Sequence, residues 1–181
     1  GFRHVTNSKR PIAVPADAKG LKLRTMENKV HMAIWKALGA DPTPMAWGEI
    51  FTALQQGTVD GQENPIPVIY TSKVYEVQKH LSLTGHVFSP AMVIMSKAKF
   101  DALPKEYQAI VLKAAVESAT YQREQITSME NEQVAKLKEL GMTVTTPDTA
   151  AFLEATKPVY EQFKGELGAD AKLLDEIIAG K

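Results

Sequence analysis

The sequence predicts an α/β protein in which a sheet with crossover helices is followed by one very long helix. In the first half, stretches with the two-residue period of a strand alternate with stretches of helical period, as at 21–26 and 28–38. This alternation is typical of a sheet with helices packed on its faces. In the second half, no Gly or Pro interrupts the chain between Pro104 and Gly141, so we expect one helix there.

The elements of the first 45 residues are predicted from local patterns. Gly20 closes a helical turn, Asn28 is suited to cap a helix, and Gly39 is suited to end it. In chain order we expect a short strand over 2–5, a helical turn over 15–19, a strand over 21–26, a helix over 28–38 and an extended segment over 41–45.

Residues 44–65 form the stretch around which the rest of the chain is organised. A helix begins at Gly48-Glu49, where an acidic side chain favours the helix dipole, and Gly57 is placed to end it. We then expect a minimal buried strand at 58–59, a turn at 60–61 and a polar loop over 62–64. A strand that leads into a polar loop is where open α/β sheets bind their ligands.

The remaining elements follow the same patterns. We expect a helix over 69–79, strands over 81–84 and 87–95, a short helix from 96 to 103, a strand over 142–145, and helices over 147–164 and 169–179. The long helix over 104–140 would measure roughly 55 Å. A compact domain of this size is only about 40 Å across. The helix is therefore kinked, packs in an oligomer, or spans two lobes.

Composition excludes several classes of function. The chain carries 21 basic and 21 acidic side chains, and this net charge of zero argues against nucleic acid as its main partner, because phosphate binding needs a basic surface. It contains no cysteine, which excludes disulfides, thiolate metal sites and cysteine catalysis. No apolar run approaches the length of about 18 residues that a membrane-spanning helix needs.

The titratable residues do not predict an enzyme. The four histidines lack metal-site spacing, and His31, one helical turn after Glu27, is most simply half of a surface pair. No nucleotide-binding or serine-hydrolase motif occurs. We therefore predict no catalytic residue, no metal and no cofactor.

Three residues allow both a structural and a functional interpretation. Arg24 is either an exposed strand-end charge in a salt bridge or a two-pronged clamp on a carboxylate. Asn64 is either a turn former before proline or an amide that hydrogen-bonds a ligand. Trp47 is either a loop packing residue or a lid on a pocket. We expect Arg24 and Asn64 to be hydrated when no ligand is bound.

Three segments resemble the substrate-binding proteins of tripartite ATP-independent periplasmic (TRAP) transporters. They are PADAKGLKLRTMEN, MAIWKALGADPTPMAWGEIFTALQQGTVDGQENP and YTSKVYEVQKHLSLTGH, in family order and at family spacing. A looser likeness continues through the long helix to TTPDTAAFLEATKPVYEQF, so the resemblance covers nearly the whole chain.

The resemblance implies a periplasmic, non-enzymatic protein that binds an organic acid between two lobes. It places Arg24 on the substrate carboxylate, Trp47 in the cleft and Asn64 on the ligand, and we include Glu63 of the same loop in the substrate-binding set. The metal site of one family branch uses an acidic-aromatic pair, which Glu63-Asn64 does not match. The implied partners are the small acid and the two membrane subunits of the transporter.

The resemblance also implies that the first lobe is missing. We expect residues 1–86 to form the second lobe of a fold like that of type II periplasmic binding proteins, with a mixed sheet. Residues 87–121 would return to the first lobe, and residues 122–181 would complete the lobe-spanning helix and pack on the second. Apolar surface left uncovered at 87–121 would drive self-association. Two alternatives are an α/β enzyme acting on organic acids and an interaction module built on the long helix.

Overall fold

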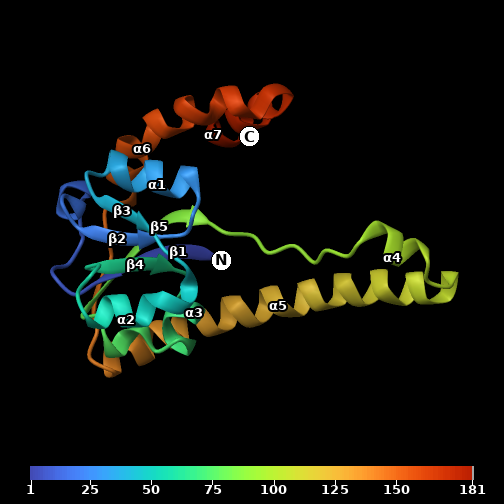
Figure 1. The fold of residues 1–181 in the computed structure, drawn as a ribbon, viewed down its shortest axis with the longest axis horizontal. Coiled ribbons are helices and arrows are strands. Elements are labelled where there is room, and N and C mark those ends of the chain that lie inside the picture. Colours follow the sequence, from blue (N-terminus) through green and yellow to red (C-terminus); the bar gives the residue numbers. More distant parts are fainter. Residues whose placement is uncertain (181) are drawn as a thin grey trace.

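The computed structural model describes residues 1–180 as one mixed sheet between two layers of helices, with a long helical arm (Figure 1). The strand order is β3-β2-β4-β1-β5-β6. Strand β2 runs parallel to β3 and β4, β1 is antiparallel to β4 and β5, and β6 is parallel to β5. The strands are β1 Phe2–Asn7, β2 Lys22–Thr25, β3 Asp41–Pro44, β4 Gly61–Asn64, β5 His80–Phe88 and β6 Thr143–Thr145. The predicted α/β class with a mixed sheet is confirmed.

The helices divide between the two faces of the sheet (Figure 1). Helices α1 and α6 cover one face, and α2, α3 and the C-terminal part of α5 cover the other. Their bounds are α1 Lys29–Ala37, α2 Ile50–Gln55, α3 Ile66–Thr71, α4 Lys97–Asp101, α5 Lys105–Glu139, α6 Thr149–Lys164 and α7 Ala171–Ile178. Short 3₁₀ turns lie at Pro15–Ala18, Trp47–Glu49, Val74–Glu76 and Gly165–Asp170. Over residues 1–180, no helix combines the length and apolarity needed to cross a bilayer.

Each face of the sheet has its own apolar core. On the α1 and α6 face, Trp35 is fully buried together with Val5 and Leu23. On the opposite face, Ile66 and Leu137 are fully buried in a cluster with residues of α2 and β5. Each such side chain contributes roughly 1.5–3 kcal/mol by leaving water.

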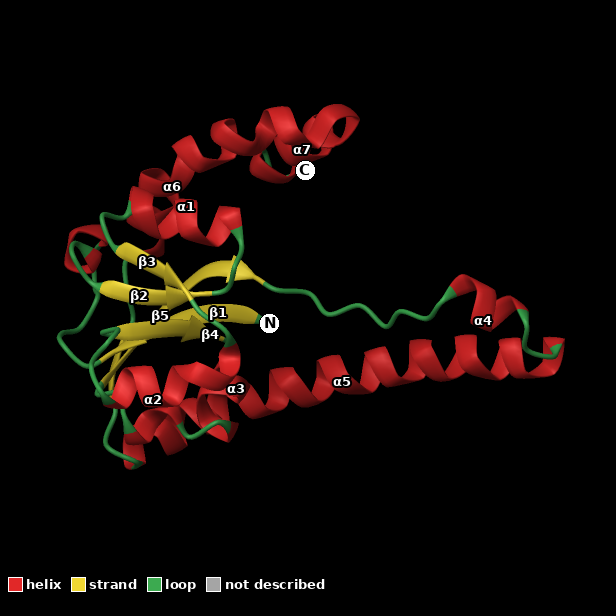
Figure 2. Cartoon of the chain, in the orientation of Figure 1, coloured by secondary structure: helices red, strands yellow, loops and turns green. Residues whose placement is uncertain are grey.

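Helix α5 is one uninterrupted helix that projects beyond the sheet (Figure 2). Its buried residues, Gln133 and Leu137, lie in its C-terminal part. Its N-terminal half exposes apolar side chains such as Ile110 and Val116 and forms an arm with α4. The expected overhang is present, and the helix has no proline to kink it.

The strand predicted over 87–95 is wrong beyond its first residues. Strand β5 ends at Phe88, and the segment 89–95 is extended without a neighbouring strand in the described chain. Met92 and Ile94 are more than four-fifths exposed. The apolar pattern of this segment is therefore not accompanied by strand pairing within residues 1–180.

The predicted strand at 58–59 and loop at 62–64 are also wrong, because β4 comprises Gly61–Asn64. The polar residues of the motif belong to a central strand that pairs with β1 along its whole length and with β2 at Gly61 and Gln62. The helix expected over 69–79 is likewise divided, since Lys73 adopts a left-handed conformation with φ of 54° between α3 and a 3₁₀ turn. Polarity concealed the strand, because exposed turns and buried polar strands share the same residue types.

Gly61 is required where β4 passes between its neighbours. A Cβ at this position would clash with the Thr6 carbonyl oxygen and would lie 2.8 Å from Leu23 Cδ2. We expect Gly61→Ala to lower the free energy of unfolding by about 3 kcal/mol, the upper range for overpacking, as measured by urea denaturation. Gly48→Ala is the matched control, because a Cβ there meets nothing within 4 Å. Equal stability of the two variants would contradict the predicted steric clash at Gly61.

Candidate functional site

The candidate site lies at the carboxyl ends of three parallel strands. Arg24 and Gln62 are register partners on β2 and β4, and Asn64 ends β4. Trp47 follows the end of β3. Because parallel strands end at one edge of a sheet, these elements bring Arg24, Trp47 and Asn64 to the same region, as ligand sites of open α/β sheets require.

Arg24 is held by the backbone of the next strand connection. Its Nε and Nη2 atoms donate to the Met45 carbonyl oxygen at 2.8 and 2.6 Å. Its guanidinium carbon lies 5.6 Å from the centre of the Trp47 ring, and that residue is 43% exposed. No residue of 1–180 bonds the remaining nitrogen, Nη1, or forms an ion pair with Arg24. The interpretation of Arg24 as an exposed salt-bridged charge is therefore wrong, since only 4% of its surface is accessible.

Asn64 is also buried, with 7% of its surface exposed. Its Oδ1 atom accepts from Arg3 Nη2 at 3.1 Å, and its Nδ2 atom donates to Gln62 Oε1 at 2.6 Å. The expectation that Arg24 and Asn64 are hydrated without ligand is wrong, because protein groups hold both of them.

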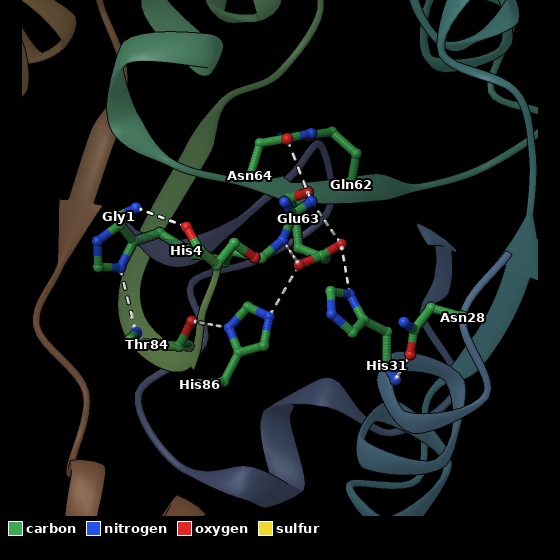
Figure 3. A network of polar contacts seen from close by, with 12 residues as sticks. Gly1, His4, Asn28, His31, Gln62, Glu63, Asn64, Thr84 and His86 are labelled. Carbon is green, nitrogen blue, oxygen red and sulfur yellow. Dashed lines mark hydrogen bonds and ion pairs between the residues drawn. The ribbon is translucent and has the colours of Figure 1, made fainter. Parts of the chain in front are cut away.

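Glu63 is the centre of a charged network and has no exposed surface (Figure 3). Its carboxylate accepts from Arg3 Nε at 2.5 Å and from Arg3 Nη2 at 2.9 Å. His86 Nε2 lies 3.1 Å from Oε2, and His31 Nδ1 lies 3.6 Å from Oε1, beyond hydrogen-bond distance. In this conformation the Glu63 oxygens face other residues, and none faces solvent.

The network keeps Glu63 ionised. Burial on its own raises the pKa of Glu63, but His31, His86 and Arg3 together hold it far below its ordinary value. Burial lowers the pKa of His86, and the neighbouring Glu63 opposes that effect. The carboxylate is therefore an acceptor only, and it fixes the guanidinium of Arg3 beside Asn64.

Sequence reasoning missed Arg3 and His86 and misplaced His31. His31 is buried beside Glu63, so its interpretation as a surface partner of Glu27 is wrong. Arg3 carried no local signal, because its partner lies sixty positions away in the chain. Within residues 1–180, no group of three or more His, Cys, Asp or Glu is arranged to hold a metal.

An irregularity in β5 positions His86. The register between β1 and β5 shifts between Arg3 and Val5, and Gly85 in the displaced segment has a φ of 55°. The Gly85 amide donates to His4 Nδ1 at 3.1 Å. Thr84 Oγ1 lies 2.7 Å from His86 Nδ1, which orients the imidazole toward Glu63 (Figure 3). His4 must be neutral at Nδ1 to accept the Gly85 hydrogen bond.

This requirement makes stability sensitive to acid. Burial, and to a lesser degree His86, lowers the pKa of His4 from 6.5 to about 4. Because the unfolded chain then binds more protons, the free energy of unfolding is highest above pH 6.5 and falls as the pH decreases toward 4. The difference between the pKa values corresponds to a loss on the order of 3 kcal/mol.

We expect His4→Asn to reduce this loss, because its amide oxygen replaces Nδ1 as acceptor and does not titrate. Urea denaturation at a series of pH values compares the variant with the wild-type chain. His80, whose pKa is lowered by burial and by Lys79, titrates in both proteins and cancels in the difference. Parallel stability curves for the two proteins between pH 6.5 and 4 would contradict the assignment.

A hollow of about 800 Å³ lies away from Arg24, between β5, α5 and α6. Its lining includes Phe2, His4, Leu83, Glu130 and Phe152 but not Arg24, Trp47 or Asn64. We therefore favour the strand ends over this hollow as the candidate ligand site, because they carry a cation, an aromatic ring and an amide.

Comparison with known proteins identifies the family of this chain. Residues 1–166 match DctP, the bacterial extracellular solute-binding protein family 7. A solute-binding protein of Verminephrobacter eiseniae is 52% identical over 94% of this chain and 51% of its own length. The 2,3-diketo-L-gulonate-binding periplasmic protein YiaO of Escherichia coli is 42% identical over 98% of this chain and 56% of its own length.

Solved structures agree with these relatives. A TRAP periplasmic solute-binding protein from Polaromonas, bound to D-erythronate, is 53% identical with a TM-score of 0.89, over 94% of this chain and 57% of that one. Another from Bordetella bronchiseptica, with density assigned to pantoate, is 48% identical with a TM-score of 0.87, over 92% and 55%.

The fold and the comparisons thus define a periplasmic solute-binding protein, a class that binds solutes and is not enzymatic. The chain belongs to the bacterial extracellular solute-binding protein family 7, the family of the TRAP periplasmic binding proteins. The predicted family and periplasmic location are confirmed. The chain spans about half the length of the curated relatives it matches.

Proposed function

We propose that this chain supplies the carboxylate-recognising wall of a TRAP transporter binding protein that captures a small organic acid. The observation that carries the proposal is Arg24, a buried guanidinium with one unbonded nitrogen beside an exposed indole ring. A guanidinium held in place presents its donors to a carboxylate without first losing rotamer freedom.

The other predicted residues have distinct roles in this proposal. Trp47 provides an apolar surface for the carbon skeleton of the acid, and Asn64 donates to one of its oxygens. Glu63 acts indirectly, through the Arg3 guanidinium that it positions against the Asn64 amide. A direct contact between Glu63 and the ligand would require its ion pair with Arg3 to open.

Hydroxylated monocarboxylates are the substrate class that we favour. The structures from Polaromonas and Bordetella contain D-erythronate and density assigned to pantoate, and both compounds carry one carboxylate with hydroxyl groups nearby. A single Arg24 clamp with a neutral amide beside it suits one carboxylate and one hydroxyl. Delivery to the two membrane subunits of the transporter completes the proposed function.

An enzyme that acts on organic acids receives less support. Glu63, the carboxylate in the predicted binding set, is fully buried and held ionised by Arg3 and two histidines, so it is not free to act as a general base.

We expect Arg24→Ala to weaken binding of D-erythronate by roughly 30-fold to several thousand-fold, because a buried charge-assisted contact is lost. Arg24→Lys keeps the charge but loses the two-pronged geometry, so we expect at least about a tenfold loss. Isothermal titration calorimetry of the intact protein measures both. Arg10→Lys is the matched control, since the side chain of the exposed Arg10 donates only to the backbone carbonyls of Asp17 and Lys19. If Arg24→Lys binds within threefold of wild type, Arg24 is not the clamp.

We also expect the 181-residue chain to self-associate through residues 87–121, which expose several large apolar side chains. Sedimentation velocity should show a dimer or a larger species. A double substitution of Ile94 and Val116 by Asp should shift it toward the monomer, whereas Leu173→Asp on α7, also at an exposed apolar position, should not. A single monomeric species at high concentration would contradict the interface.

A further inference from the structure

A chain of buried side-chain hydrogen bonds runs from Asn64 across the sheet to the loop before β5. Asn64 Nδ2 donates to Gln62 Oε1 at 2.6 Å, and Gln62 Nε2 donates to Thr6 Oγ1 at 3.0 Å. Thr6 Oγ1 then donates to Gln78 Oε1 at 3.0 Å. All four residues are at most 7% exposed, so no bulk water competes for these donors and acceptors.

The backbone at the far end sets the direction of this chain. Gln78 Nε2 lies 3.3 Å from the Asp60 carbonyl oxygen and 3.0 Å from that of Val77. Carbonyl oxygens accept and cannot donate, so Gln78 must turn its NH₂ group toward them and its oxygen toward Thr6. The Thr6 hydroxyl must then donate to Gln78, and it is left to accept from Gln62.

The direction of these hydrogen bonds also fixes the amides of Gln62 and Asn64. With its NH₂ group committed to Thr6, Gln62 can offer only Oε1 to Asn64. Asn64 must therefore direct Nδ2 toward Gln62 and Oδ1 toward Arg3, whose Nη2 donates to it. A reversed amide would bring two donors together at Arg3 and two acceptors together at Gln62.

We propose that Gln62, Thr6 and Gln78 are positioning residues that fix the orientation of the Asn64 amide and leave one Nδ2 hydrogen free to donate to the bound acid. This inference rests on the proposed function, because it assigns a supporting role to residues behind that site. Strand pairing makes the support rigid, since Thr6 and Gln62 are register partners, as are His4 and Asn64.

The test is a double-mutant cycle in the intact protein. Thr6→Val removes the hydroxyl with little change of shape, and Thr6→Ser retains it. We expect Thr6→Val to weaken D-erythronate binding about fivefold, near the value of one net hydrogen bond, and Thr6→Ser to stay within about twofold. In the Asn64→Ala background, Thr6→Val should have no further effect. An equal loss in both backgrounds, or no loss in either, would overturn the proposal.

A second measurement does not depend on the ligand. In ¹⁵N-labelled protein, the Asn64 side-chain NH₂ protons should exchange with water at least about tenfold faster in Thr6→Val than in Thr6→Ser. Equal exchange in the two variants would overturn the inference. If Thr6→Val does not fold, Gln78→Leu removes the acceptor of the Thr6 hydroxyl, one hydrogen bond farther from Asn64.

These measurements distinguish failure of the proposed binding site from failure of the proposed role of Gln62, Thr6 and Gln78. If Asn64→Ala binds D-erythronate as well as wild type does, the proposed site fails. The exchange rates still decide whether Gln62, Thr6 and Gln78 orient the Asn64 amide. If Asn64→Ala weakens binding and Thr6→Val does not, the site stands and the relay fails.

Discussion

The structure depends most on the ion pair between Arg3 and Glu63. A carboxylate without solvent contact is costly unless its charge is compensated and its lone pairs are used. Here Arg3 of β1 supplies two hydrogen bonds, His86 of β5 a third contact, and His31 of α1 faces the other oxygen. Because Glu63 lies on β4, one charge ties three separate chain segments to the centre of the sheet.

This constraint explains irregularities that would otherwise weaken the fold. Strand β5 gives up regular pairing with β1 where Thr84, Gly85 and His86 leave the register, and the displaced segment brings an imidazole to Glu63. The amide of Gly85 regains a partner in His4. The sheet thus loses ladder bonds locally, and the compensation of a buried charge offsets that cost.

Strand alternation separates two kinds of polar network on β4. Glu63 points to the α1 face and takes part in the charged network, whereas Gln62 and Asn64 belong to the neutral relay. Arg3 joins the two, because it bonds both the Glu63 carboxylate and the Asn64 amide. A site built on paired strands holds its donors more firmly than a mobile loop would.

The sequence was sufficient for much of the fold and for part of the site. Periodicity and capping residues located α1, α5 and α6, because helices are specified by local spacing. β4 was missed, because GQEN looks like a loop unless its buried partners are known. Arg24 and Trp47 could be placed at strand ends, but the buried state of Arg24 depends on Met45, which only the fold brings near. The Arg3–Glu63 pair joins distant segments and has no periodic signal.

The same geometry decides how strongly this chain alone can hold an acid. The proposed site has one wall within this chain, because Arg24 and Trp47 lie at the ends of the parallel strands and neither lines the 800 Å³ hollow. An ion pair that stays partly in water contributes about 0–1 kcal/mol, whereas a desolvated one contributes more. The chain spans about half of its relatives' length, and its exposed apolar arm extends away from the sheet. We therefore expect high affinity to require a second surface that excludes water from an acid bound at Arg24.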